Sequence, residues 1–179
     1  TELAQVRKKF SDERRTKIEN VSGEVDIEDL IPVEDCVLTY TNIGYIKRMA
    51  LDAYKTQKRG GKGVIGMKQR EEDVVNEMFV ASTHDNILFI TTKGIMYKLK
   101  CYEIPEGSKA SRGLNAVNLL PLQEDEKIAA MIKTEDFDEG KYLILVTKNG
   151  KIKRTKLSAY KNVRKNGLIA IGLDEGDEI

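Results

Sequence analysis

A threefold internal repeat is the feature that most constrains the fold of this chain. The three copies cover residues 37–66, 87–117 and 143–172, and each begins with an apolar segment that ends in Thr before a turn. A glycine recurs in that turn at spacings of 50 and 56 residues, as Gly44, Gly94 and Gly150. We interpret each copy as one supersecondary unit that is repeated along the chain.

The register is kept at three further positions of the repeat. A second glycine follows the turn glycine by 19, 19 and 17 residues, as Gly63, Gly113 and Gly167, and an arginine shortly precedes it, as Arg59, Arg112 and Arg164. Ten residues after the turn glycine stand Tyr54, Ile104 and Tyr160. Because the tyrosine recurs in register, we expect Tyr54 and Tyr160 to pack inside the unit rather than to act as nucleophiles.

The residue pattern of the repeat predicts a mainly β fold. Short β-branched runs alternate with turns such as Thr-Lys-Gly and Lys-Asn-Gly, which suit tight hairpins because Gly and Asn tolerate positive φ. A unit of roughly 50 residues with four short antiparallel strands has the size of a propeller blade. The alternative is an ordinary β-sandwich whose hairpins look alike.

The first 35 residues differ from the repeats. Leu3, Val6 and Phe10 stand at helical spacing, which predicts a short amphipathic helix over residues 1–10. The chain opens inside this pattern without a cap, so we expect the helix to be the end of a longer element. Residues 24–35 carry six acids, one proline and no basic residue, which is typical of a linker.

The net charge of +1 hides an alternation along the chain. Taken alone, the near-zero total argues against a polyanion-binding protein. Divided by segment, the charge is +7 for residues 36–70, −5 for 71–92, +3 for 93–118, −5 for 119–140 and +9 for 141–167. Positive charge therefore recurs with the repeat, on the hairpin and on the segment that follows it.

A periodic set of cations predicts a basic rim that binds phosphates without reading bases. The expected rim residues are Lys47, Arg48, Lys98, Lys100, Arg112, Lys153, Arg154, Lys156, Arg164 and Lys165. Aromatic residues do not interleave with these cations, which favours duplex DNA over unstacked single strands. The alternative is that exposed lysines serve solubility and edge protection.

The sharpest local motif is a loop of three cations and three glycines. It consists of Gln57, Lys58, Arg59, Gly60, Gly61, Lys62 and Gly63. Glycines let backbone N–H groups approach phosphate oxygens closely. The loop is not a Walker A motif, because no Ser or Thr follows a Gly-Lys pair at the required spacing.

This heptapeptide resembles the signature box of bacterial DNA gyrase A subunits, whose usual form is Gln-Arg-Arg-Gly-Gly-Lys-Gly. Lys58 stands where Arg is usual, which keeps the charge but loses the guanidinium geometry. The resemblance covers essentially the whole chain. Its further stretches are residues 10–16 (FSDERRT), 27–32 (IEDLIP), 44–48 (GYIKR), 79–85 (FVASTHD), 110–113 (ASRG) and 117–122 (VNLLPL).

The resemblance implies a division of the chain. Residues 1–22 would be the end of the breakage and reunion domain, and residues 23–35 an acidic linker. Residues 36–179 would be part of the carboxy-terminal β-pinwheel, with about three repeats that start near 37, 87 and 143. In that family the pinwheel wraps duplex DNA, so that the holoenzyme introduces negative supercoils with ATP hydrolysed by its B subunits.

The same resemblance implies partners and a location. The partners would be double-stranded DNA, the gyrase B subunits and a second copy of the A subunit, in a cytoplasmic, nucleoid-associated complex without membrane contact. The parent complex would be an ATP-dependent type IIA topoisomerase that uses ATP and Mg²⁺ through its B subunits. For this chain we expect no catalytic residue, because the catalytic tyrosine would lie outside it, and no bound cofactor or metal. Cys36 and Cys101 are expected to pack as small apolar groups.

Three other functions remain open from the sequence. The A subunit of topoisomerase IV shares the domain plan but usually lacks an intact box, so residues 59–63 favour gyrase. A propeller-type scaffold could use the basic rim for acidic protein partners. An autonomous enzyme is disfavoured because the single histidine, His84, has no Cys or Ser partner indicated, and we expect it to cap or hydrogen-bond a turn.

Overall fold

The computed structural model describes residues 2–12, 16, 27–51, 73–108 and 110–179, in two compact units. The first unit, Thr1–Leu30, holds helix α1 (Glu2–Phe10) and the 3-10 turn η1 (Ile27–Leu30). The predicted amino-terminal helix is thereby confirmed. No helix in the described part of the chain has both the length and the apolar character needed to cross a membrane.

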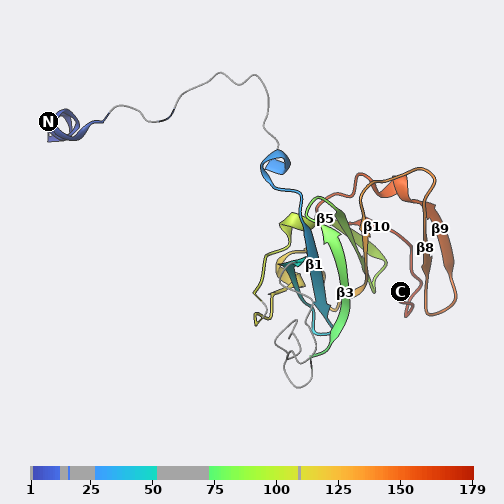
Figure 1. Cartoon of the computed structure of the whole chain (residues 1–179). Coiled ribbons are helices and arrows are strands. Elements are labelled where there is room, and N and C mark those ends of the chain that lie inside the picture. Colours follow the sequence, from blue (N-terminus) through green and yellow to red (C-terminus); the bar gives the residue numbers. More distant parts are fainter. Residues whose placement is uncertain (1, 13–15, 17–26, 52–72, 109) are drawn as a thin grey trace, which may run out of the picture. The chain divides into compact units, whose positions relative to one another are not determined.

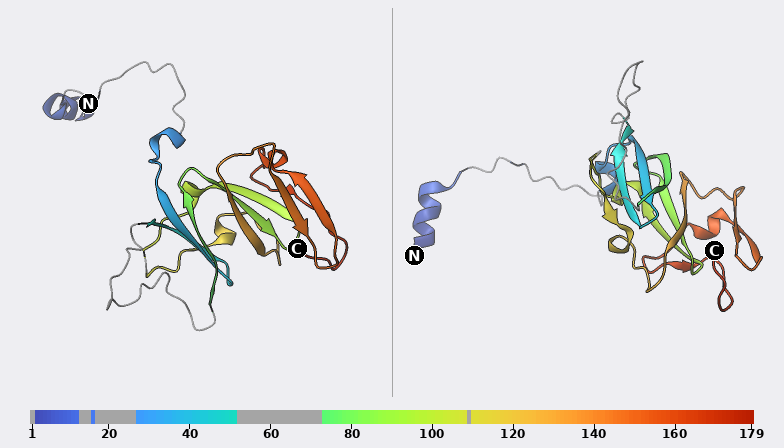
Figure 2. Two further views of the ribbon diagram at one scale, coloured as in Figure 1. Left: turned by 45° about the vertical axis from the view of Figure 1, so that its right-hand side comes forward. Right: turned by 90° about the horizontal axis from the view of Figure 1, so that it is seen from below.

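In the described part of the second unit, Ile31–Ile179, the strands form three antiparallel sheets (Figures 1 and 2). Sheet A has the order β3 (Val75–Ser82), β1 (Asp35–Thr41), β2 (Tyr45–Ala50), β6 (Leu114–Asn115). Sheet B has the order β10 (Leu168–Ile169), β5 (Ile95–Lys100), β4 (Asn86–Thr91), β7 (Ile128–Thr134). Sheet C is the hairpin of β8 (Tyr142–Val146) and β9 (Ile152–Lys156). Short 3-10 turns follow as η3 (Cys101–Glu103), η4 (Ala116–Asn118) and η5 (Leu157–Tyr160).

The three hairpin turns have the same hydrogen bonds, as the repeat predicts. In each turn the glycine has positive φ, and its N–H donates to the carbonyl of the Thr three residues earlier at 2.9 Å. The Oγ1 of that Thr accepts the N–H of the residue after the glycine, at 3.1 to 3.3 Å. The Thr and the Gly are therefore both needed to close the turn, which explains why the pair recurs.

Each complete sheet combines strands from two repeats. The two-residue strand β6 belongs to the second repeat but pairs with β2 of the first, with Ile46 opposite Leu114. In the same way β10 of the third repeat pairs with β5 of the second, with Met96 opposite Leu168. The segment after a hairpin, which we call the return segment, runs from β5 to β6 in the second repeat and from β9 to β10 in the third. It crosses back to complete the preceding sheet, so the sheets are offset from the repeats in the sequence.

Sheet B lies between two apolar clusters. On one side Ile87, Phe89 and Tyr97 pack with side chains of sheet A, and on the other Leu88, Ile90 and Met96 pack with side chains of sheet C. Every residue of β4 is buried, which explains its continuous apolar run. The expected packing role of Tyr160 is confirmed, because it is buried in the second of these clusters, whereas Tyr54 lies outside the described residues. Ile104, at the same position of the second repeat, is buried in the first cluster.

Sheet C buries one of its two faces. Leu143 and Leu145 are buried against sheet B, whereas Ile144 and Val146 between them remain 59% and 52% exposed. Ile152 on β9 is opposite Val146 and is also exposed. The face of sheet C that carries Ile144, Val146 and Ile152 is thus exposed, whereas the corresponding faces of sheets A and B are buried against the next sheet.

Replacing Gly113 by Ala will destabilise the second unit much more than replacing Gly150. Both glycines have φ near +87°, but an added Cβ at Gly113 would lie 2.4 Å from the Ile46 carbonyl oxygen, whereas at Gly150 it meets nothing within 4 Å. The positive φ alone costs about 1–2 kcal/mol, and the clash adds about 1–3 kcal/mol.

Urea unfolding measures both free energies. We expect a loss of about 3 kcal/mol or more for Gly113→Ala and about 1–2 kcal/mol for Gly150→Ala. Equal losses would contradict the close crossing of the return segment over β2.

Candidate nucleic-acid interface

The predicted box and the predicted rim have different outcomes in the structure. The box, residues 57–63, lies outside the described part of the chain. All ten rim residues are described, and they fall into two groups. The five rim residues of the first two repeats are buried or partly buried and bound within the fold, whereas the five of the third repeat are exposed.

Lys47 is fully buried, so a DNA phosphate cannot reach it. Its Nζ donates to the carbonyl oxygens of Ser108 and Ser111, both at 2.9 Å, and burial lowers the pKa of its ammonium. The side chain lies against Gly107 and Gly113 of the same loop. Lys47 therefore holds the return loop of the second repeat, and we exclude it from the DNA-facing surface.

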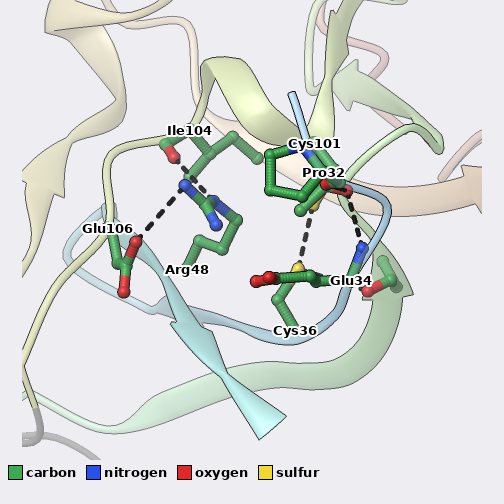
Figure 3. A network of polar contacts seen from close by, with 9 residues as sticks. Pro32, Glu34, Cys36, Arg48, Cys101, Ile104 and Glu106 are labelled. Atoms are coloured by element: carbon green, nitrogen blue, oxygen red, sulfur yellow. Dashed lines mark hydrogen bonds and ion pairs between the residues drawn. The ribbon is translucent and has the colours of Figure 1, made fainter. Parts of the chain in front are cut away.

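Arg48 fastens the next repeat to sheet A. Its Nε donates to the carbonyl of Ile104 at 3.3 Å, and its guanidinium forms an ion pair with Glu106 at 3.7 Å (Figure 3). The backbone of Arg48 also accepts the N–H of Gly107 at 2.9 Å. The arginine is thus tied to the return segment by both its side chain and its main chain.

Lys98 occupies the position in β5 that Arg48 occupies in β2, four residues after the turn glycine. Its ammonium donates to the carbonyl of Lys161 and lies 5.2 Å from the centre of the Phe137 ring. Burial and the charge of Lys100 lower the pKa of Lys98, and Glu103 opposes this effect. Lys98 therefore fastens the third repeat much as Arg48 fastens the second.

Lys100 and Arg112, in the hairpin and the return segment of the second repeat, are both partly buried. Lys100 donates to the carbonyl of His84 at 3.2 Å, and the Nε2 of His84 lies 2.9 Å from the carbonyl oxygen of Ile31. The expected hydrogen-bonding role of His84 is thereby confirmed. The guanidinium of Arg112 lies 5.1 Å from the centre of the Tyr45 ring, which orients it without neutralising its charge.

The exposed cations are concentrated on β9 and on the segment after it. Residues 141–167 contain nine basic residues and no acid. Lys153 donates to the carbonyl of Ala170 at 2.6 Å, and Arg154 lies over the Tyr142 ring at 3.8 Å. The remaining predicted rim residues of this repeat, all exposed, are Lys156, Arg164 and Lys165.

Ion pairing separates the exposed cations from other lysines of the same repeat. Lys141, Lys148 and Lys151 pair with Asp136, Glu178 and Asp174 at 2.8 to 3.2 Å. Within the described ranges, by contrast, no carboxylate forms an ion pair with Arg154, Lys156, Arg164 or Lys165. We call these four residues the basic surface.

A hollow joins the basic surface to the second repeat. Lys165 and Lys98 both line this space, which has a volume of about 640 Å³ and is also lined by Asn118, Asn166 and Glu103. The two asparagines add amide donors that sequence analysis missed, because nothing in their spacing distinguishes them from loop asparagines. The hollow is the place where cations of two repeats come together.

Comparison with known proteins relates this arrangement to one family. The family model described as "DNA gyrase C-terminal domain, beta-propeller" matches residues 37–82, 85–135 and 141–179. The chain belongs to this family. Its fold is accordingly the β-pinwheel that the repeat and the resemblance predict, with antiparallel sheets and one short amino-terminal helix.

The relatives of the chain include DNA gyrase A subunits from different bacteria. It is 52% identical to the DNA gyrase A subunit of Clostridium acetobutylicum and 50% identical to that of Campylobacter jejuni, over 99% of this chain in both cases. The chain spans 21% of the length of these relatives. The sequence similarity therefore extends beyond the three matched segments to the first 36 residues.

Two solved structures have a similar fold at 30% identity. One is the C-terminal domain of DNA topoisomerase IV, with a TM-score of 0.71 over 83% of this chain and 45% of that one. The other is the DNA gyrase A C-terminal domain, with a TM-score of 0.63 over 80% of this chain and 45% of that one. Both domains are thus about twice as long as the part that this chain matches.

Replacing Lys47 by Met will reduce stability, whereas the same change at Lys156 will not. The Lys47→Met variant leaves the carbonyls of Ser108 and Ser111 without their ammonium donor, which costs about 2 kcal/mol. Lys156 is exposed, so Lys156→Met changes the free energy of unfolding by less than about 0.5 kcal/mol. Urea unfolding measures both variants, and equal stabilities would contradict the structural role of Lys47.

Proposed function

We propose that the chain is the DNA-wrapping element of a gyrase and binds duplex DNA through the basic surface. The observation that carries the proposal is a group of four predicted rim cations on the third repeat, Arg154, Lys156, Arg164 and Lys165, which are exposed and form no ion pair within the described part of the chain. Unpaired cations on a surface attract DNA phosphates, and the counterions condensed on the DNA are released when the protein binds. Membership of the gyrase C-terminal domain family supports DNA as the polyanion.

The chemistry of the basic surface favours the DNA backbone over the bases. Its side chains are Lys and Arg on a short strand and a loop, without a helix that could enter the major groove. The ring of Tyr142 is occupied by Arg154 and so is not offered to a base. We propose that Lys98 and Arg112 extend the contact toward the second repeat, and that residues 57–63 extend it in the first.

We propose the following division of the chain. Residues 1–22 are the end of a breakage and reunion domain, residues 23–35 are a linker, and residues 36–179 are part of a pinwheel with repeats that start near 37, 87 and 143. The exposed face of Ile144, Val146 and Ile152 supports the last point, because the corresponding faces of sheets A and B are covered by the next sheet.

We also propose how the chain contributes to the supercoiling activity of a whole gyrase complex. A bend imposed on DNA by successive sheets would present a second segment to the cleavage core. The partners would be the gyrase B subunits and a second copy of the A subunit, in the cytoplasm. ATP and Mg²⁺ would act through the B subunits, and we assign no residue of this chain to them. We also propose no catalytic residue in the chain.

Topoisomerase IV is the second candidate, because its C-terminal domain has a similar fold at the same 30% identity as the gyrase domain. Two observations favour gyrase. The relatives that are 50% and 52% identical to the chain are A subunits of gyrase, and residues 59–63 keep the glycine and cation pattern of the box.

Removing three cations of the basic surface will weaken DNA binding and reduce its salt dependence. The variant carries Lys156→Ala, Arg164→Ala and Lys165→Ala, and binding of a linear duplex is measured from low to moderate salt. Each lost phosphate contact lowers the slope of log K against log salt by about 0.9, so we expect a reduction of about 3.

The control variant carries Lys141→Ala, Lys148→Ala and Lys151→Ala, which removes the same charge from three lysines that pair with acids. Its slope should change by less than about 1. Equal effects of both triple variants would mean that net charge, and not the basic surface, controls binding. Retention on an acidic protein without retention on DNA would favour a scaffold instead.

Changing the box will separate supercoiling from relaxation in the holoenzyme. In a gyrase whose A subunits carry this chain, the variant Lys58→Ala, Arg59→Ala, Lys62→Ala should lose ATP-dependent supercoiling and retain relaxation. The reason is that the box contributes to wrapping and not to cleavage. Agarose gels of plasmid topoisomers measure both activities, and unchanged supercoiling would contradict the assignment to gyrase.

A further inference from the structure

The only two cysteines of the chain meet in the joint between the first two repeats. Cys36 lies in β1 of sheet A, and Cys101 begins η3 after β5 of sheet B. Both are buried, and their Sγ atoms are 3.3 Å apart (Figure 3). A disulfide bond is about 2.0 Å long, so the two sulfurs need to approach by little more than about 1 Å.

The backbone around the pair holds the two sulfurs in this position. The N–H of Cys101 donates to the carbonyl of Asp85 at 2.8 Å, and the Sγ of Cys36 donates to the carbonyl of Ala81 at 3.2 Å. Both carbonyls belong to the end of β3 and the turn that follows, so one short segment fixes both cysteines. The contact is therefore part of the joint and not an accidental approach of two flexible side chains.

The surroundings of the pair make the two thiols differ in acidity. The hydrogen bond from Cys101 lowers the pKa of the Cys36 thiol, and the positive charge of Arg48 also lowers it, against the effects of burial, Asp85 and Asp35. The same hydrogen bond raises the pKa of Cys101, together with burial. Cys36 is therefore the sulfur that ionises more readily, and when it loses its proton it gives up the hydrogen bond to Ala81, while Cys101 keeps its proton as the donor.

We propose that Cys36 and Cys101 form a reversible intramolecular disulfide when a peroxide oxidises them, which links the first sheet covalently to the second repeat. The Cys36 thiolate attacks the O–O bond of hydrogen peroxide, becomes a sulfenic acid and releases hydroxide. The sulfur of Cys101 then attacks the sulfenic sulfur, its thiol proton leaves with the hydroxyl group as water, and the S–S bond forms. In total two thiols and one hydrogen peroxide give one disulfide and two waters.

The disulfide would reinforce a joint that is otherwise non-covalent. Beside the cysteines the joint depends on Arg48, which bonds Ile104 and Glu106 (Figure 3). A covalent link between residues 65 positions apart restricts the unfolded chain strongly. We expect the melting temperature of the oxidised chain to rise by about 10 °C, and a dithiol to reverse the change.

The test starts from the reduced chain, which is treated with hydrogen peroxide while it is folded. The chain is then denatured, and maleimide labels any thiol that remains. The expected product is a monomer that has lost the mass of two hydrogens, carries no maleimide and yields a peptide in which Cys36 is joined to Cys101. The variants Cys36→Ala and Cys101→Ala retain one thiol each, so neither can lose two hydrogens as a monomer.

Three results would overturn the proposal. The first is a wild-type chain that still carries two maleimides after peroxide treatment. The second is oxidation to sulfinic acid, or to a disulfide between two copies, in place of the internal bond. The third is an internal disulfide that forms as fast in urea as in the folded chain, because contact in the native joint would then contribute nothing to the reaction.

Discussion

The crossing of each return segment onto the preceding sheet is the interaction on which the rest of the structure depends. A hairpin of two strands is marginal in water, and its outer strand presents unpaired N–H and C=O groups. In sheet A the segment after the second hairpin satisfies that edge, with hydrogen bonds from Arg48 to Pro105, from Gly107 to Arg48 and through β6. Sheet B is completed in the same way by β10 of the third repeat. The repeats are therefore mutually dependent.

This crossing also decides what each cation can do. A buried ammonium is stable only if its donors are satisfied, and Lys47 meets that requirement with two carbonyls of the crossing loop. Arg48 and Lys98 stand at equivalent positions of their hairpins, and each bonds a carbonyl of the next repeat. Positive charge in the first two hairpins thus partly maintains the architecture. The unpaired charge of the third repeat is the part most available to a phosphate backbone.

The sequence predicts the elements within each repeat well, but it does not predict which strands of different repeats pair with each other. Turn glycines, the amino-terminal helix, the buried Tyr160 and the hydrogen-bonded His84 follow from local pattern and occur as expected. The strands β6 and β10 have two residues each, too few to show a period, so their pairing with another repeat cannot be read from sequence. The burial of Lys47 depends on carbonyls 61 and 64 residues away, and the contact of Cys36 with Cys101 spans 65 residues. Pattern alone likewise gives no reason why Leu145 is buried and Ile144 exposed.

The most direct test of the account is the handedness of the DNA path around the protein. A nicked circular plasmid is sealed by ligase in the presence of saturating gyrase A subunits that carry this chain. The protein is then removed, and the linking number is measured on two-dimensional gels. Wrapping around successive sheets predicts a shift of the linking number with a consistent sign relative to plasmid sealed without protein. An unchanged distribution of topoisomers under conditions where the DNA is fully bound would contradict the account.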